Sequence, residues 1–139
     1  MKRIELIMGR NIPDGGRVSD YMINEFIRNE IMPHFEYGTF IDGEGLWKGE
    51  YEKTKIFYIE VADTEAIATA VLLRHVADRY RKQFRQESVL VSEVETSTSW
   101  ISWQQEHSLI KQDLKHMWQF TNWHYCGCVI NSYSIIICV

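Results

Sequence analysis

The stretch GLWKGEYEKTKIFYIEV, residues 45–61, decides how the fold of this chain is interpreted. It contains Trp47, crosses a short charged turn, and continues as a strand of alternating side chains. Because successive strand residues point to opposite faces of a sheet, Phe57, Ile59 and Val61 share one face and the residues between them share the other. This period of two indicates a strand in the middle of the chain.

A carboxylate stands at the mouth of that strand. Glu52 lies where the turn becomes the strand, directly after the aromatic Tyr51. A carboxylate beside an aromatic ring can face a ligand. The alternative is a solvated hairpin acid, since single carboxylates are usually surface charges. Spacing alone leaves both interpretations open.

The composition is that of a globular protein with a modest acidic excess. The chain has 139 residues, 45% of them hydrophobic, and a net charge of −4 from 15 basic and 19 acidic residues. Without a basic excess to neutralise phosphates, we expect no nucleic-acid partner. The chain contains no apolar run of membrane-spanning length, and its N-terminus is too soon polar for a signal peptide, so we expect no membrane association. Three cysteines crowded at one end do not make a secreted disulfide framework, which favours the cytoplasm.

The remaining chain supplies five further elements around the central strand. In order, the elements are a strand over residues 4–12, a helix between Ser19 and Pro33, a strand over residues 37–41, the central strand, a helix capped by Thr64, and a strand over residues 88–95. This βαββαβ order predicts an α+β, ferredoxin-like sandwich, with one antiparallel sheet covered on one face by helices. The other face is bare, with residues such as Phe57 or Ile59 expected on it, and self-association would cover it economically.

Two details and a boundary complete the expected architecture. A glycine-rich turn is expected over residues 42–45, and the second helix is expected to bury an apolar stripe. That stripe consists of Ile67, Val71, Leu72, Val76, Tyr80 and Phe84. We expect a domain over residues 1–96 and a C-terminal helical extension with an apolar tail over residues 97–139.

The C-terminal cysteines invite a metal interpretation. Cys126 and Cys128 flank a glycine, with His124 before them and Cys138 further on. Zinc sites usually have two or more residues between paired cysteines, so this spacing is a weak signal. We therefore expect no metal site and no cofactor.

Polar residues at the mouths of the strands predict a small-ligand site. In this topology the loop after the second helix reaches the end of the sheet where the third strand begins, so Gln86 can lie near Glu52. Glu87 and Ser88 follow in the same loop. Trp47 and Tyr51 could supply aromatic faces for a purine or a cation, although nothing here names a reaction.

Two resemblances extend this prediction. Residues 6–95 resemble an uncharacterised family of small bacterial and phage domains. The motifs that carry this resemblance are Met8-Gly9, the Gly15 to Ser19 helix start, Pro33-His34-Phe35, Gly45-Leu46-Trp47, Glu52-Lys53-Thr54-Lys55, and the Tyr80 to Val89 segment. The same region looks like the phage enzymes that degrade S-adenosylmethionine, the lyases formerly called hydrolases. The matching segments are Gly45 to Lys48, Glu52-Lys53-Thr54, Asp63 and Val89-Leu90-Val91.

The second resemblance implies a function. Those enzymes are PII-like trimers with active sites at subunit interfaces, and they counter host restriction in the host cytoplasm. The substrate's own carboxylate displaces methylthioadenosine and closes homoserine lactone, so the conformation of the bound substrate does much of the work. The resemblance implies that Glu52 holds the substrate's positive charge, that Gln86 contacts adenine or ribose, and that Trp47 lines the pocket. Glu87, Ser88 and Tyr51 are the other substrate-binding candidates.

This chain departs from those enzymes in a shorter turn before Glu52 and in having Trp47 where they have a tyrosine. Two alternatives therefore remain. One is a PII-like oligomer that binds a nucleotide-like ligand without chemistry. The other is a purely structural oligomer in which Glu52 is a surface acid.

Overall fold

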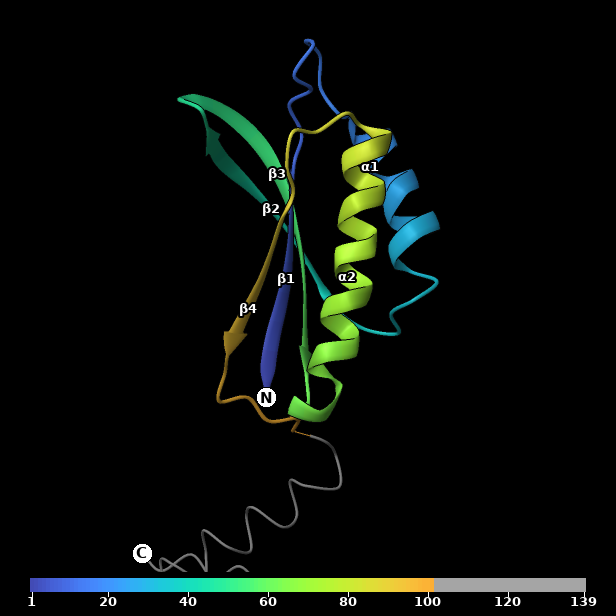
Figure 1. Cartoon of the computed structure of the whole chain (residues 1–139), viewed down its shortest axis with the longest axis vertical. Coiled ribbons are helices and arrows are strands. Elements are labelled where there is room, and N and C mark those ends of the chain that lie inside the picture. Colours follow the sequence, from blue (N-terminus) through green and yellow to red (C-terminus); the bar gives the residue numbers. More distant parts are fainter. Residues whose placement is uncertain (102–139) are drawn as a thin grey trace, which may run out of the picture. The chain divides into compact units, whose positions relative to one another are not determined.

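A single antiparallel sheet with helices on one face forms the described part of the molecule, residues 1–101 of the computed structural model (Figure 1). In chain order the elements are β1 Lys2–Gly9, α1 Asp20–Phe26, the π-helical turn η1 Ile27–Ile31, β2 Thr39–Trp47, β3 Glu50–Val61, α2 Asp63–Gln83 and β4 Leu90–Glu95. The strand order is β2-β3-β1-β4, with every neighbouring pair antiparallel. This arrangement confirms the α+β, ferredoxin-like fold.

Residues Met1–Thr98 form one compact unit. The expected helical extension over residues 97–139, including His124, Cys126, Cys128 and Cys138, lies outside the described residues apart from its first few positions. The proposed boundary at residues 96 and 97 stays a prediction. Within residues 1–101, no helix combines the length and apolarity needed to span a membrane.

The core lies between the sheet and the two helices. Phe57, Ile59 and Val61 of β3 share one face, as their alternation predicts, and that face is buried together with Ile4 and Leu6 of the neighbouring β1. It is the face covered by the helices, so the expectation that Phe57 and Ile59 lie on the bare face was wrong. The buried residues of the two strands lie side by side, because Leu6 pairs with Phe57 and Ile4 with Ile59. Directly paired residues of neighbouring strands share a face. Helix α1 packs on α2 through an edge-to-face contact of Phe26 with Tyr80, at 5.1 Å between ring centroids.

The first helix begins where the sequence predicts. The Ser19 hydroxyl accepts a hydrogen bond from the Met22 N–H at 3.2 Å, satisfying one of the otherwise unpaired amides of the first turn. Val18 before the cap and Ile23 after it are both buried.

The buried face of α2 differs from the predicted stripe. Ile67 is 80% exposed and Val71 is 45% exposed, so these two assignments were wrong. The face that meets the sheet is made instead by the small residues Ala66 and Ala70, followed by Leu73. Alanines let the helix approach the sheet closely. The prediction counted only large apolar side chains, and it therefore placed Ile67 and Val71 on the buried face instead of Ala66 and Ala70. The N-cap was also wrong: it is Ala62, without a side-chain hydrogen bond, and Thr64 lies inside the helix.

The predicted turn at residues 42–45 is also wrong, because β2 runs straight through Gly43 and Gly45 to Trp47. The chain reverses after the end of β2 instead, at Lys48 and Gly49. Their φ values of +50° and +83° are those of a tight hairpin turn. A long β2–β3 hairpin results, and its tip projects beyond the rest of the sheet (Figure 1).

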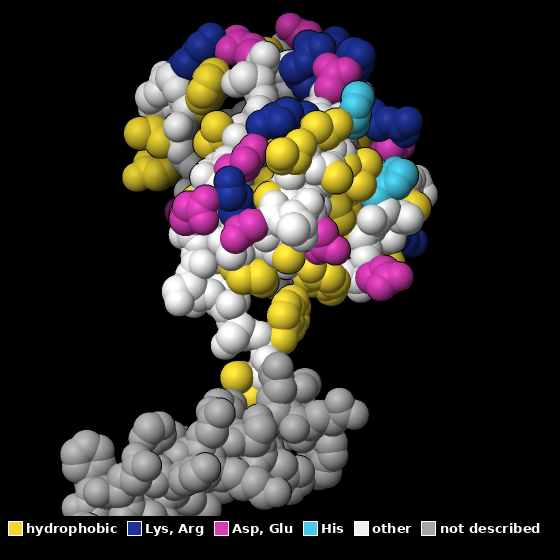
Figure 2. All heavy atoms as spheres, turned by 60° about the horizontal axis from the view of Figure 1, so that its bottom comes forward, with side chains coloured by type: hydrophobic (Ala, Val, Ile, Leu, Met, Phe, Trp, Pro, Cys, Tyr) yellow, Lys and Arg dark blue, Asp and Glu magenta, His cyan; other side chains and the backbone are white. Residues whose placement is uncertain are grey.

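The surface mixes charges of both signs. Figure 2 shows Lys and Arg side chains beside Asp and Glu side chains, interspersed with hydrophobic groups. Ion pairs such as Arg74 with Glu93 and Lys2 with Glu95 account for part of this pattern. The sheet face away from the helices also carries exposed apolar side chains, among them Ile41, Leu90 and Val94. We call this surface the open face.

Candidate active site

A cavity of about 490 Å³ lies on the open face, at the end where β1 finishes and β3 begins. Its walls come from strands β1, β2 and β3, the tip of the β2–β3 hairpin, and two loops. Those loops are residues 11–13, after β1, and residues 86–88, after α2. Both lie at the same end of the sheet (Figure 1). The antiparallel topology therefore brings together segments that are far apart in the sequence.

Glu52 lies in this cavity. It is paired with Gly45 of β2 in the register of the sheet, which places it on the open face. Its Oε2 accepts a hydrogen bond from the backbone N–H of Asn11 at 3.3 Å. The side chain is partly exposed, so a ligand in the cavity can reach the carboxylate.

Asn11 is a member of the site that the sequence did not reveal. Its side-chain Nδ2 donates to the Tyr51 carbonyl at 3.0 Å, and its own carbonyl accepts from Gln86 Nε2 at 2.9 Å. The Arg10 N–H donates to the Lys53 carbonyl at 3.0 Å, so this loop continues alongside the start of β3. A lone Asn after a strand is typical of any turn, which is why no sequence signal marked it.

Gln86 lies at the same end as Glu52, but its amide is engaged by the protein. Nε2 donates to the carbonyls of Asn11 and Phe84, and only 8% of the residue is exposed. The side chain therefore ties the loop after α2 to the loop after β1.

The hairpin tip is held to the loop after α2 by one carboxylate. Glu87 Oε2 lies 2.6 Å from Lys48 Nζ and accepts a hydrogen bond from Trp47 Nε1 at 3.4 Å. The contacts from Lys48 and then Trp47 lower the pKa of Glu87 below its ordinary value of 4.5. Together they hold the indole of Trp47 at the rim of the cavity.

Of the two remaining predicted site residues, Ser88 lines the cavity and Tyr51 does not. Ser88 lies in the cavity lining beside Glu87. Tyr51 lies outside the lining and is 78% exposed; its contribution here is the backbone carbonyl that Asn11 binds. It pairs with Leu46, one residue out of step with Glu52, and so projects from the opposite face of the hairpin.

The lining is acidic. Glu50, Glu52 and Glu87 are its acidic residues on the open face or in the loop after α2, and Lys48 is its basic residue. An acidic, partly apolar cavity with an indole at its rim suits a cationic ligand with an aromatic portion. Among residues 1–101, no group of three or more His, Cys, Asp or Glu side chains is placed to hold a metal ion.

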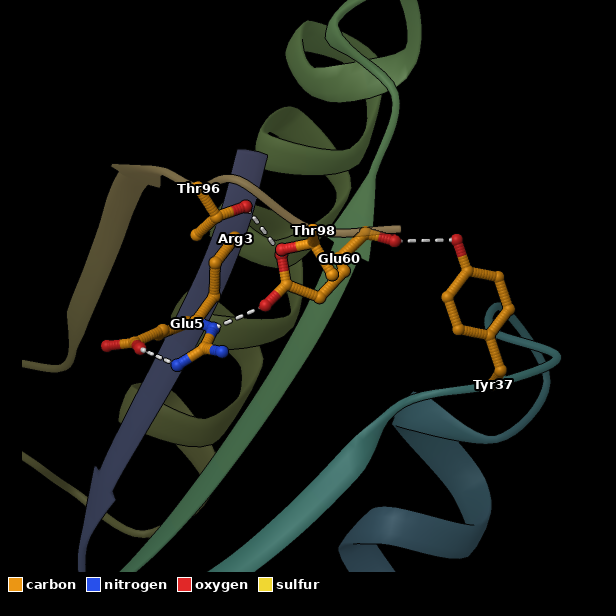
Figure 3. Close-up of polar contacts among 6 residues, drawn as sticks. All are labelled: Arg3, Glu5, Tyr37, Glu60, Thr96 and Thr98. Carbon is orange, nitrogen blue, oxygen red and sulfur yellow. Dashed lines mark hydrogen bonds and ion pairs between the residues drawn. The ribbon is translucent and has the colours of Figure 1, made fainter. Parts of the chain in front are cut away.

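A second polar cluster lies at the other end of the open face (Figure 3). Glu60 accepts hydrogen bonds from Arg3 Nε at 2.7 Å, Thr96 Oγ1 at 2.8 Å and Thr98 Oγ1 at 3.2 Å. Burial opposes ionisation of Glu60, but these hydrogen bonds outweigh it and lower its pKa. The cluster binds the segment after β4 to the sheet, and both carboxylate oxygens of Glu60 already have protein partners. It is therefore a structural cluster rather than a ligand site.

The fold and the cavity define the class: a ferredoxin-like α+β domain with an acidic cavity, lined in part by Trp47, on the open face of its sheet. Residues 3–100 match the family described as "Protein of unknown function (DUF3574)", and the chain belongs to this family. No curated protein matches the chain.

Two solved structures of a phage SAM lyase share the fold. The apo form is 16% identical, with a TM-score of 0.51, and the match covers 73% of this chain and 92% of the phage protein. The form in complex with S-methyl-5'-thioadenosine is 15% identical, with a TM-score of 0.50 and the same coverage. At this identity the likeness is one of fold.

Proposed function

We propose that this protein cleaves S-adenosylmethionine to methylthioadenosine and homoserine lactone. The observation that carries the proposal is the placement of the Glu52 carboxylate inside an acidic, Trp47-rimmed cavity on the open face. The substrate is a cation with a purine at one end, which matches the charge and the aromatic rim. The shared fold with phage SAM lyases, one of them bound to S-methyl-5'-thioadenosine, supports the same assignment.

The reaction is an intramolecular displacement. A carboxylate oxygen of the methionyl group attacks the γ-carbon and forms the lactone C–O bond. The bond from that carbon to sulfur breaks, and its electron pair returns to sulfur, giving a neutral thioether. The atoms balance without water, metal or proton transfer, so the protein has to fold the substrate into an attack conformation.

Glu52 has the central role in this scheme. Its carboxylate holds the substrate's ammonium group or stabilises the positive charge near sulfur. Trp47 stacks on the adenine or on the sulfonium. Gln86 keeps the two loops together, and its remaining acceptor oxygen is its route to an adenine or ribose contact. Ser88 and the backbone of the loop after α2 complete the wall, while Tyr51 acts through its carbonyl.

Assembly is the second part of the proposal. The open face carries Ile41 on one edge strand and Leu90 and Val94 on the other, each 44% or more exposed, so apolar side chains face solvent at both edges of the sheet. We propose a homotrimer that buries this face and closes the cavity at subunit interfaces. In a phage-infected cell the reaction would remove, in the host cytoplasm, the methyl donor used by restriction–modification systems.

The deciding experiment incubates the purified full chain with S-adenosylmethionine in ¹⁸O-labelled water and follows the products by NMR and mass spectrometry. Methylthioadenosine and the lactone are expected, and homoserine from later ring opening should carry label in its carboxylate. Label in the homoserine hydroxyl would mean that water attacks the γ-carbon directly, which contradicts the lyase mechanism.

Glu52→Gln tests the carboxylate, with Glu36→Gln as the control because Glu36 is an exposed acid outside the cavity. We expect Glu52→Gln to lower turnover by about 10²-fold or more, as for loss of a transition-state electrostatic contact, and Glu36→Gln to leave it unchanged. Binding without turnover in the wild type would favour the PII-like binding module. Neither binding nor turnover would favour the structural oligomer.

A further inference from the structure

The carboxylate of Glu52 occupies the space above Gly9. Gly9 is the last residue of β1, and a Cβ built on it would lie 2.5 Å from Glu52 Oε2 and 2.6 Å from Oε1. Real Cβ atoms do not approach oxygen so closely. Any side chain at position 9 would therefore displace the carboxylate from its present place.

Nothing in the backbone itself demands glycine at this position. The positive-φ glycines of residues 1–101 are Gly15, Gly16, Gly38 and Gly49, and Gly9 is not among them. The obstruction at Gly9 is the end of a flexible side chain and not a neighbouring main chain. An added methyl group is thus compatible with the fold but incompatible with the present position of Glu52.

Asn11 holds the same carboxylate from the side. Its N–H donates to Glu52 Oε2 at 3.3 Å, while the Asn11 side-chain Nδ2 donates to the Tyr51 carbonyl and the Asn11 carbonyl accepts from Gln86 Nε2. The donor therefore cannot follow the carboxylate if the carboxylate moves. Gly9 and Asn11 thus both contact the space or the atoms that define where the acid lies.

We propose that Gly9 and Asn11 are positioning residues for Glu52, Gly9 by leaving the space that the carboxylate fills and Asn11 by aiming it with a backbone hydrogen bond. Their importance for turnover rests on the proposed S-adenosylmethionine cleavage. The geometric coupling between Gly9 and Glu52 does not depend on it.

A double-mutant cycle on thermal unfolding of the full chain tests the coupling without any assay of activity. In the Glu52→Ala background, Gly9→Ala should raise the unfolding midpoint by roughly 2–4 °C, because the unfolded chain loses freedom and no carboxylate is displaced. In the wild-type background the same substitution should stabilise less or should destabilise. Equal shifts in both backgrounds would overturn the proposal. If Gly9→Ala alone does not fold, folding of the double variant would support the coupling, and failure of both would overturn it.

Gly43→Ala is the matched control. Gly43 lies on the same face and in the same cavity, but an added Cβ would have no atom within 4 Å. Its effect on the midpoint should be the same whether Glu52 is present or not. The Asn11 amide proton gives a second readout: its NMR shift should move upfield in both Gly9→Ala and Glu52→Ala, and should stay in place in Gly43→Ala.

Activity supplies the last arm. If the wild type cleaves S-adenosylmethionine, Gly9→Ala should lower kcat about tenfold or more and change KM less, since the acid remains but is misplaced. An active Gly9→Ala variant with unchanged kcat would contradict the positioning role. If no variant shows turnover but the unfolding cycle is coupled, the proposed reaction fails while the positioning of Glu52 stands.

Discussion

The hydroxyl of Tyr80 donates a hydrogen bond to the carbonyl oxygen of Gly9 at 2.8 Å, joining the last turns of α2 to the end of β1 directly behind the candidate site. Tyr80 is fully buried, and burial raises the pKa of its hydroxyl, so it remains a donor across the physiological range. This hydrogen bond connects α2 to the end of β1, where the Glu52 carboxylate lies against Gly9.

Tyr80→Phe should therefore destabilise the protein by about 1–2 kcal/mol, because the partly buried Gly9 carbonyl loses this donor. Chemical denaturation followed by circular dichroism measures the change. Tyr21→Phe is the control: Tyr21 is 71% exposed, and its loss of a hydroxyl should change the unfolding free energy by less than about 0.5 kcal/mol. Equal effects of the two substitutions would contradict a structural role for the Tyr80 hydroxyl.

The buried face of α2 can be tested with a pair of truncations. Leu73 is fully buried, and Leu73→Ala should cost about 2–5 kcal/mol through lost burial and a residual cavity. Ile67→Ala, at a position that is 80% exposed, should change the unfolding free energy by less than about 0.5 kcal/mol. A large cost at Ile67 and a small one at Leu73 would mean that the helix presents the other face.

The contact of Trp47 with Glu87 should depend on pH. Because the pKa of Glu87 is lowered below 4.5, the carboxylate keeps Lys48 and Trp47 at higher pH and releases them only as the pH falls through that lowered pKa. The indole Nε1–H resonance of Trp47 should therefore titrate with a midpoint below 4.5. Glu87→Gln should abolish this titration. A midpoint at or above the ordinary value would show that the contact does not form in solution.

Glu60 should contribute to the loss of stability in acid. Its folded-state pKa is below the ordinary value of 4.5, so its contribution is complete above that value and is lost as the pH falls through the lowered pKa. Glu60→Gln should destabilise the protein most above about pH 5.5, and the difference from wild type should shrink toward pH 3. Denaturant unfolding at a series of pH values measures it. A Glu60→Gln difference independent of pH would rule out the ionised cluster.

Assembly through the open face makes a further prediction. Ile41→Lys places a charge among exposed apolar side chains of that face and should reduce the sedimentation mass of the protein to that of a monomer. Ile67→Lys introduces the same charge on an exposed position of α2 and should leave the assembly intact. A monomeric wild type, or an Ile41→Lys variant that still assembles, would contradict the proposed trimer.

Local pattern was enough for most of the fold. The alternation of Phe57, Ile59 and Val61 and the cap at Ser19 depend on neighbours a few residues away, so the sequence contained them in full. The order of helices and strands then leaves few topologies for one antiparallel sheet, and the ferredoxin-like arrangement is the one observed.

Tertiary structure decided the rest. Whether Ile67 or Ala66 meets the sheet depends on how closely α2 can approach it, and a helical period of apolar residues does not specify that distance. The site depends still more on long-range pairing: Asn11 and Glu52 are 41 residues apart, and Gln86 is 75 residues from Asn11. Glu52 could be named as a candidate from its place at a strand mouth, but only the resemblance favoured it over a surface acid. Gly9 and the backbone N–H of Asn11 meet Glu52 only when β1 and β3 pair in register. The sequence around positions 9 and 11 does not indicate which carboxylate will lie against them.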